Sequence, residues 1–316
     1  MKRRVVKHGS ATLTISLPIK WVKKYGIKPG DELEINEEKG NLLISTSRDV
    51  SQVHTALLNI DRYGPIGLQA LGSLYRSGCD VIRISFKESH TVSEIEEFLF
   101  QLPGFEIMHQ DETTCTLKEV SVPTHTEDME DIIKRTFLVL ISIAKDVEEH
   151  IAPIQNKQAL QSLSKRDATI NKFCNFCRRI LNKKGISRIK DAPMIYYILE
   201  SLENLGDSYK HFCTLLVEQD LLITNPKIIS TIKETNKLVE NFFYLYFKFS
   251  DESARTFQET ARSNLTKIAE FHTIKNLQDL IILDSFARIT SQLIQMVGPL
   301  LAMRVPDRCM TPEKSN

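Results

Sequence analysis

The 316-residue sequence predicts a multidomain α+β protein, in which a short β-rich segment precedes a small α/β domain and a long all-α region. Three patterns predict this order. Residues 12–17 alternate strictly between hydroxyl and apolar side chains, which is the period of a half-buried strand. Strand and helix patterns alternate over 50–120, and apolar residues recur with helical spacing over 126–303. We therefore expect three domains, over residues 1–48, 50–120 and 126–303.

Composition restricts the class of protein. Hydrophobic residues make up 42% and charged residues 26% of the chain, which is ordinary for a globular protein with buried cores. No run of 18 apolar residues occurs, and strand-like alternation rather than an apolar signal core follows the basic N-terminus. We therefore predict a cytoplasmic protein that has neither a membrane span nor a signal peptide.

The first 48 residues predict two β-hairpins around a short helix. Pro18 ends the strand over 12–17, and a helix of about two turns is expected over 19–25. The turn residues 38–41 then close a second hairpin. Because so small a unit cannot bury a core alone, we expect an obligate dimer with exchanged strands, that is, a swapped-hairpin β dimer domain.

The N-terminal segment is also strongly basic. Residues 1–28 contain eight Lys and Arg residues and no Asp or Glu, although the net charge of the whole chain is only +1. Such a local positive field favours a polyanion as partner, because Lys and Arg neutralise phosphates and release their counterions. The alternative is a solvated basic surface that serves solubility only.

The segment from Gly9 to Asp31 resembles the AbrB/SpoVT/MazE family of swapped-hairpin dimeric DNA-binding domains. The matching features are the strand that ends in Leu17-Pro18, the short basic helix, and the spacing Gly-x-x-x-Gly-Asp before the next strand. Many members carry an Arg directly after the first Gly, where this chain has Ser10. Any role of that Arg is therefore not transferred to this sequence.

The DNA contacts are then expected to come from other basic residues. These are Arg3, Arg4, Lys7, Lys20, Lys23 and Lys24. A two-fold homodimer would present these side chains twice, which favours a pseudo-palindromic DNA site. Because few of them are candidates for contacting base edges, we expect DNA shape to contribute to selectivity.

The middle of the chain predicts a small α/β domain. Strands are expected at 52–59, 80–86, 105–109 and 114–119, and helices at 65–77 and 92–102. No Gly-rich phosphate loop and no cluster of metal-binding residue types occur in this part of the sequence.

The C-terminal region predicts a duplicated helical unit. Six helices are expected, at 127–150, 157–182, 188–220, 226–249, 251–273 and 276–303. They form two sets of three helices of similar length, which indicates an all-α pair of three-helix bundles. Within 188–220, the acids Glu200, Glu203 and Asp207 lie on one face at spacings of three and four residues. Such neighbours repel one another unless a cation or a basic side chain lies close.

The helical region resembles the PhoU family of phosphate-uptake regulators, whose fold is a pair of three-helix bundles. The segment Leu202–Asp207 matches that family's Glu-x-x-x-Asp signature, with Gly206 before the Asp, and Ser164–Asn171 is similar to its second-helix motif. The resemblance implies a divalent or iron cation bound by Glu203, Asp207 and Asp167, because oxygen ligands suit Mg²⁺, Mn²⁺ or iron.

Two further observations bear on this metal hypothesis. The second helical set has Asp284 and Arg288 where the signature would place its acids, and an Arg opposes a bound cation, so only the first set is expected to keep a site. The alternative is an acidic surface that pairs with Lys210 or with nearby lysines.

Both resemblances occur in the order found in archaeal phosphate-uptake regulators, which join such domains through an α/β segment. They imply a transcriptional regulator of phosphate uptake whose helical domain senses a signal or docks on a phosphate transporter or a sensor kinase. The alternative is a dimeric PhoU-like signalling adaptor that does not bind DNA. An antitoxin is disfavoured, because antitoxins usually follow this domain with a short disordered tail.

We do not expect an enzyme. No Ser/His/Asp order, P-loop or His-Glu-x-x-His motif occurs, and the eight histidines are dispersed. The six cysteines are scattered over a long chain, which argues against a disulfide framework. Cys174 and Cys177 form a Cys-x-x-Cys pair, but no second pair completes four zinc ligands, so we expect both to be buried or half-buried on a helix.

Overall fold

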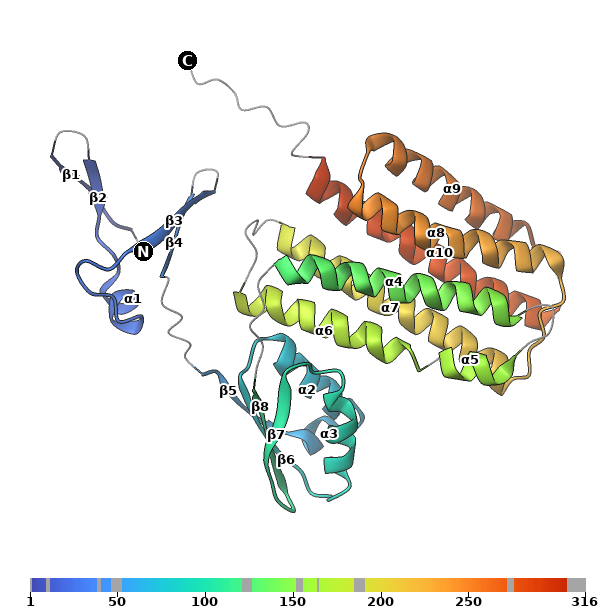
Figure 1. Cartoon of the computed structure of the whole chain (residues 1–316), viewed down its shortest axis with the longest axis horizontal. Coiled ribbons are helices and arrows are strands. Elements are labelled where there is room, and N and C mark those ends of the chain that lie inside the picture. Colours follow the sequence, from blue (N-terminus) through green and yellow to red (C-terminus); the bar gives the residue numbers. More distant parts are fainter. Residues whose placement is uncertain are drawn as a thin grey trace. The chain divides into compact units, whose positions relative to one another are not determined.

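Figure 1 shows the computed structural model of the chain. The residues that the structure describes are 2–9, 12–38, 41–46, 53–120, 127–151, 156–163, 165–184, 191–271 and 276–305. Ser10, the turn residues 39–40 and Ser164 lie outside these ranges. The chain divides into two compact units, Met1–Val53 and His54–Asn316.

The N-terminal unit consists of two separate hairpins and one short helix. Its elements are β1 (Val5–His8), β2 (Thr12–Ile15), α1 (Ile19–Lys24), β3 (Leu33–Glu38) and β4 (Asn41–Thr46). β1 pairs antiparallel with β2, and β3 pairs antiparallel with β4. Pro18 directly precedes α1 with φ −63°, which suits a helix start. The order hairpin, helix, hairpin agrees with the sequence prediction, and strand exchange between two copies stays a prediction.

The second unit begins with a four-stranded sheet that carries helices. Its elements are β5 (Thr55–Asn59), the 3₁₀ helix η1 (Ile60–Ile66), α2 (Gly67–Arg76), β6 (Val81–Ser85), α3 (Thr91–Leu99), β7 (Phe105–Gln110) and β8 (Thr114–Glu119). The strand order is β5-β6-β8-β7, in which β5 and β6 are parallel and the other neighbours are antiparallel. These elements agree closely with those predicted over 50–120, except that η1 was not predicted.

The core of this α/β region lies between the sheet and its helices. Alternation decides which strand residues face it, since Ile82 and Ile84 of β6 are buried while Arg83 between them is exposed. α2 and α3 lie on the same side of the sheet in Figure 1. Tyr75 of α2 is completely buried, and its hydroxyl donates a hydrogen bond to the carbonyl of Pro103 at 2.9 Å.

The remainder of the second unit is helical. Its helices are α4 (Glu127–Ile151), α5 (Lys157–Leu163), α6 (Asp167–Lys184), α7 (Ala192–Glu218), α8 (Pro226–Phe247), α9 (Asp251–Glu270) and α10 (Leu277–Arg304). α4, α6 and α7 pack on one another, and so do α8, α9 and α10. Contacts of α7 with α10 and of α4 with α8 join the two sets (Figure 1).

Local sequence signals explain most helix boundaries. Pro193 and Pro226 lie in the first turns of α7 and α8, and Ser250 begins α9 with a capping box. The single helix predicted over 157–182 is wrong, because a turn at Lys165 and Arg166 separates α5 from α6. The reason is a tertiary contact: the Arg166 guanidinium reaches back to Asp146 and Ser142 on α4.

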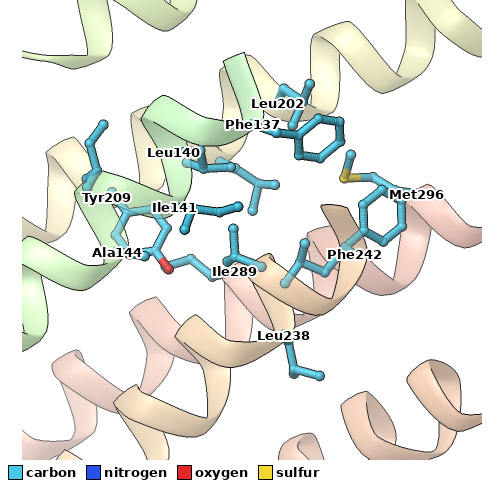
Figure 2. Packing of buried hydrophobic residues seen from close by; sticks show 14 of the residues in the cluster. Phe137, Leu140, Ile141, Ala144, Leu202, Tyr209, Leu238, Phe242, Ile289 and Met296 are labelled. Atoms are coloured by element: carbon cyan, nitrogen blue, oxygen red, sulfur yellow. The ribbon is translucent and has the colours of Figure 1, made fainter. Parts of the chain in front are cut away.

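One continuous core fills the helical part. Figure 2 shows side chains of α4, α7, α8 and α10 converging in it. Aromatic rings meet edge to face there, for example Phe212 of α7 and Phe286 of α10 with centroids 4.9 Å apart. α10 is long and apolar enough to span a membrane by length and composition alone. Its buried residues, including Phe286, Leu293 and Met296, belong to this core, which accounts for that apolar character.

A polar joint connects the α/β region to the helical core. Arg179 of α6 is buried and donates hydrogen bonds to the carbonyls of Tyr75 and Cys79, each at 2.8 Å. Its guanidinium carbon lies 4.9 Å from the ring centroids of both Tyr75 and Phe105, and its Nη2 lies 3.1 Å from a carboxylate oxygen of Glu119. Each part therefore has its own core, while α6 holds the two parts together.

Candidate nucleic-acid interface and acidic site

The basic residues predicted to bind DNA are all exposed. Lys20, Lys23 and Lys24 lie on α1 at spacings of three and four residues, which places them on one face of the helix. Trp21 and Val22 on the same helix are half-buried. The helix thus presents a charged face and a separate apolar face.

The other three basic residues belong to the first hairpin. Lys7 lies on β1, opposite Leu13 of β2, and Arg3 and Arg4 directly precede this strand. The structure therefore groups three of the six predicted residues on one helix face and leaves the other three on a neighbouring stretch of chain. Polar contacts to a phosphate backbone need this kind of exposed Lys and Arg side chain.

The N-terminal unit has no core of its own. Among the residues described there, none is buried. Val5, Leu13 and Ile15 of the first hairpin are 61%, 70% and 52% exposed, and Ile35 and Leu42 of the second hairpin are 60% and 65% exposed. Because water contact with so many apolar side chains is unfavourable, these surfaces need a covering partner.

In the helical part, Glu203 of the predicted acidic site is held by an arginine. Arg178 of α6 pairs with Glu203 and donates from Nη1 to Oε2 of Glu200 at 2.6 Å. Its side chain is only 3% exposed, and its guanidinium lies 5.8 Å from the ring centroid of Tyr196. No sequence pattern predicted the role of this arginine; the available signal is the pair of adjacent arginines between the apolar residues Cys177 and Ile180.

Asp167 forms a second centre beside it. The carboxylate is 3% exposed, and its Oδ2 accepts hydrogen bonds from Lys210 Nζ at 3.2 Å and from Asn171 Nδ2 at 3.1 Å. Its Oδ1 lies 2.8 Å from the place that a Cβ on Gly206 would occupy. Burial raises the pKa of Asp167, the negative charge of Asp207 adds to this rise, and Lys210 opposes it. Close packing therefore explains why a glycine stands in the middle of α7.

The predicted metal ligands do not fit a metal site in this arrangement. Glu203 is paired with Arg178, Asp167 with Lys210, and Asp207 is exposed. Over the described ranges, no three His, Cys, Asp or Glu side chains lie close enough together to hold a metal ion. Glu203 and Asp167 are instead paired with basic side chains. Lys210 is the partner of Asp167 that the alternative above named, whereas the partner of Glu203 is an arginine.

The corresponding pair in the second helical set is on the surface. Arg288 Nη2 lies 2.9 Å from Asp284 Oδ2, and both side chains are more than half exposed. Cys174 and Cys177, by contrast, are fully buried on α6, which confirms the role expected for this pair. Burial raises the pKa of the Cys177 thiol to about 12, so that it stays protonated at neutral pH.

The comparisons with known proteins concern the N-terminal unit. Residues 6–51 match the model of a family described as antidote-toxin recognition MazE, bacterial antitoxin. Searches of curated proteins and of solved structures gave no match. The N-terminal unit is thus similar to MazE/AbrB-type domains, which are compatible with DNA-binding regulation. The family match does not extend to the helical part.

Proposed function

We propose that the protein is a transcriptional regulator that binds DNA as a homodimer. The observation that carries this proposal is the exposed row of Lys20, Lys23 and Lys24 on α1, in a unit similar to MazE/AbrB-type domains. Three lysines on one short helix can each neutralise a phosphate of the same DNA segment. The preceding residues Arg3, Arg4 and Lys7 add to the positive surface.

The homodimer follows from the apolar surfaces of the two hairpins. A second copy would cover Leu13, Ile15, Ile35 and Leu42, for which a single copy of the unit provides no core. Exchange of hairpins between copies would bury these side chains and place two copies of α1 on one assembly. The bound DNA is then a pseudo-palindromic site.

The helical part is proposed to be a PhoU-like sensing or docking domain, and the regulated process is phosphate uptake. The support is its two helical sets, α4 to α7 and α8 to α10, together with the close packing of Asp167 against Gly206 that joins the two sequence motifs. A phosphate transporter or a sensor kinase is the proposed partner of its helix surfaces. No step of this proposal requires a bound metal ion.

Fluorescence anisotropy with mixed duplex DNA fragments over a salt series tests the DNA proposal. We expect binding that weakens with salt at a logarithmic slope of about −0.9 per phosphate contact. The variant Lys20→Glu/Lys23→Glu/Lys24→Glu should lose binding. The matched control Lys165→Glu/Lys227→Glu/Lys233→Glu changes the same charge on exposed lysines of the helical part and should bind like the unchanged protein.

The alternative is a dimeric PhoU-like signalling adaptor that does not bind DNA. It is favoured by Ser10, which stands where many members of the resembled family carry Arg, and by a net charge of only +1. Absence of DNA binding at low salt, or equal binding by both triple variants, would support the adaptor and rule out the regulator as argued here.

A further inference from the structure

We propose that α9 is a detachable helix, which separates from α8 and α10 while the rest of the helical part stays folded. Figure 1 shows α9 at the edge of the helical part, and its extensive contacts are with α8 and α10. Release of α9 would uncover the apolar core of this helical set, so that α9 acts as a gate over it. The inference rests on the packing of α9 alone and does not depend on the DNA proposal.

For its length, α9 buries few large side chains. Four of its 20 residues are buried, and Phe257 is the large apolar residue among them, beside Ala254, Ala261 and Asn264. Ile268 adds a half-buried side chain near the C-terminal end. By comparison, α8 buries ten of 22 residues and α10 ten of 28. Because burial of apolar surface is the main force that attaches a helix to a core, α9 is the most weakly attached helix of its set.

Asn264 places a polar group within this small contact. The residue is 3% exposed, and its Nδ2 donates hydrogen bonds to the hydroxyl oxygens of Thr235 on α8, at 2.8 Å, and of Thr290 on α10, at 3.2 Å. Its Oδ1 is buried, and over the described ranges it has no hydrogen-bond partner. A buried carbonyl oxygen without a partner is unfavourable, and release would expose it to water. This atom therefore favours the released helix.

Grooves on both sides of α9 reduce its packing further. One groove, of about 440 Å³, lies between α9 and α10, and its lining includes Ala254, Gln258 and Val297. The second groove, of about 410 Å³, lies between α9 and α8, and its lining includes Leu238 and Asn264. Gln258 Oε1 is also buried without a hydrogen-bond partner in the described part of the chain. The flanks of α9 thus lack neighbouring atoms, and each missing contact loses dispersion energy.

The start of α9 is held within the helix itself. Ser250 and Ser253 form the capping box, in which each backbone N–H donates to the hydroxyl oxygen of the other residue at 3.0 Å. Across to α8, Lys267 Nζ lies 2.8 Å from Glu234 Oε2, and the two side chains are 53% and 42% exposed. An exposed ion pair of this kind contributes little to stability. Release therefore breaks a weak ion pair and leaves the cap of α9 in place.

The ring beneath α9 connects this gate to the other helical set. Phe257 packs edge to face on Phe242 of α8, with ring centroids 5.4 Å apart, and Phe242 is completely buried. The centroid of Phe242 also lies 6.2 Å from that of Phe137 on α4, and Figure 2 shows both rings in the shared core. Release of α9 would expose one face of Phe242. The released state therefore differs from the closed state at a ring that both helical sets share.

Hydrogen exchange of the full chain, followed by mass spectrometry at neutral pH, tests the proposal. A released helix of 20 residues is only marginally stable in water, so its amides exchange when it separates. We expect the amides of α9 to exchange at least about a hundredfold faster than those in the middle of α8 and α10. Low urea concentrations should accelerate exchange in α9 less than in α8, because release exposes less surface than global unfolding does. Equal exchange in the three helices would overturn the proposal.

Two leucine variants separate release of α9 from melting within it. Asn264→Leu replaces the buried amide with an apolar side chain of similar volume, and we expect exchange in α9 to slow by about tenfold. Exchange in α8 and α10 should stay unchanged. The matched control Thr256→Leu adds the same side chain on the exposed face of α9. Asn and Thr have similar helix propensities, so both variants strengthen the helix itself to a similar extent.

Slower exchange of α9 in Asn264→Leu than in Thr256→Leu is the expected result. Equal exchange in the two variants, or faster exchange of α9 in Asn264→Leu, would overturn the proposal, because the buried amide would then not favour release. Circular dichroism verifies that both variants fold, and the comparison of α9 with α8 and α10 in the unchanged protein requires neither of them. Loss of DNA binding in the anisotropy experiment would leave the inference intact.

Discussion

Arg178 of α6 and Glu203 of α7 form an ion pair in which the guanidinium side chain is 3% exposed and the carboxylate side chain 22% exposed. The same guanidinium also binds Glu200 one turn earlier on α7. Two of the three acids that share a face of α7 are therefore neutralised from inside the bundle. The guanidinium of Arg178 thus offsets the repulsion between the carboxylates of Glu200 and Glu203 that the sequence predicts.

Removal of this arginine should destabilise the fold strongly. Arg178→Met leaves Glu200 and Glu203 without their buried partner, and we expect a loss of about 3 kcal/mol in the free energy of unfolding. Urea denaturation followed by circular dichroism measures it. The control Arg288→Met removes an exposed pair with Asp284 and should cost less than about 1 kcal/mol. Equal losses in the two variants would contradict a special role for Arg178.

Gly206 and Gly298 are two helical glycines for which substitution by Ala has different expected effects. In Gly206→Ala the new Cβ would lie 2.8 Å from Asp167 Oδ1, so we expect a loss of about 1–3 kcal/mol from overpacking. In Gly298→Ala the Cβ would meet no atom within 4 Å outside its chain neighbours and the adjoining turns of the helix backbone. The gain in helix propensity is opposed by crowding between this Cβ and the ring of Pro299, so we expect a change of less than about 0.5 kcal/mol. Thermal melting of both variants measures the difference, and stabilisation by Gly206→Ala would show that the close approach is absent.

Asp167 should make stability depend on pH. The pKa of Asp167 is raised in the folded protein. The contribution of Asp167 to the free energy of unfolding is therefore fully present below the pKa that this carboxyl has in the unfolded chain, and it is lost as the pH rises through the folded pKa. Asp167→Asn imitates the neutral acid, so the variant should be more stable than the unchanged protein at pH 7. This advantage should disappear as the pH falls below about 4.

Asp111 should make stability depend on pH in the opposite direction. Hydrogen bonds from Thr114 and Thr113 lower the pKa of Asp111, so its contribution is present at neutral pH and is lost on acidification. Asp111→Asn should therefore be less stable than the unchanged protein at pH 7. Urea denaturation at several pH values measures both variants, and the same sign for both would contradict the assignment.

The exposed apolar surfaces of the hairpins should control assembly. Leu13→Glu/Leu42→Glu places charge on both surfaces, and we expect a dimer to become monomeric because charged groups resist burial in an interface. Light scattering after size-exclusion chromatography measures the mass. Leu277→Glu changes a 69% exposed leucine of α10 and is expected to leave the mass unchanged. A monomeric unchanged protein would disprove the dimer itself.

The fold could be predicted from the sequence wherever the signal is local. Alternation located the strands of the α/β region, and Pro193 and Pro226 located the starts of two helices. The break between α5 and α6 was missed because Arg166 is held by Asp146 on another helix, twenty residues earlier in the chain. The helical spacing of apolar residues within 157–182 cannot reveal a contact with a residue on another helix.

The same distinction applies to the candidate site. The spacing of Glu200, Glu203 and Asp207 correctly placed these acids on one face of α7, because helical geometry alone decides it. Which residue faces them depends on the rotation of α6, and that rotation is decided by packing over the whole core. Arg178 therefore pairs with Glu203, whereas its neighbour Arg179 lies beside Glu119 of the α/β region. A single sequence could not assign these two partners.

Arg179 offers the sharpest test of the joint between the α/β region and the helical core. Arg179→Lys keeps the charge, but one ammonium group cannot replace both Nη1, which donates to the carbonyls of Tyr75 and Cys79, and Nη2, which lies beside Glu119. We therefore expect a loss of about 2 kcal/mol in stability. Hydrogen exchange should become faster in α2 and in β8, which carries Glu119. Exchange in α8 and α9, which do not touch Arg179 directly, should change only as far as global stability does. If hydrogen exchange becomes faster by the same factor in all helices and strands, Arg179 supports the whole unit rather than the joint. Unchanged stability would mean that the lysine replaces the guanidinium group, and that contacts of α2 with α6 suffice to hold the two parts together.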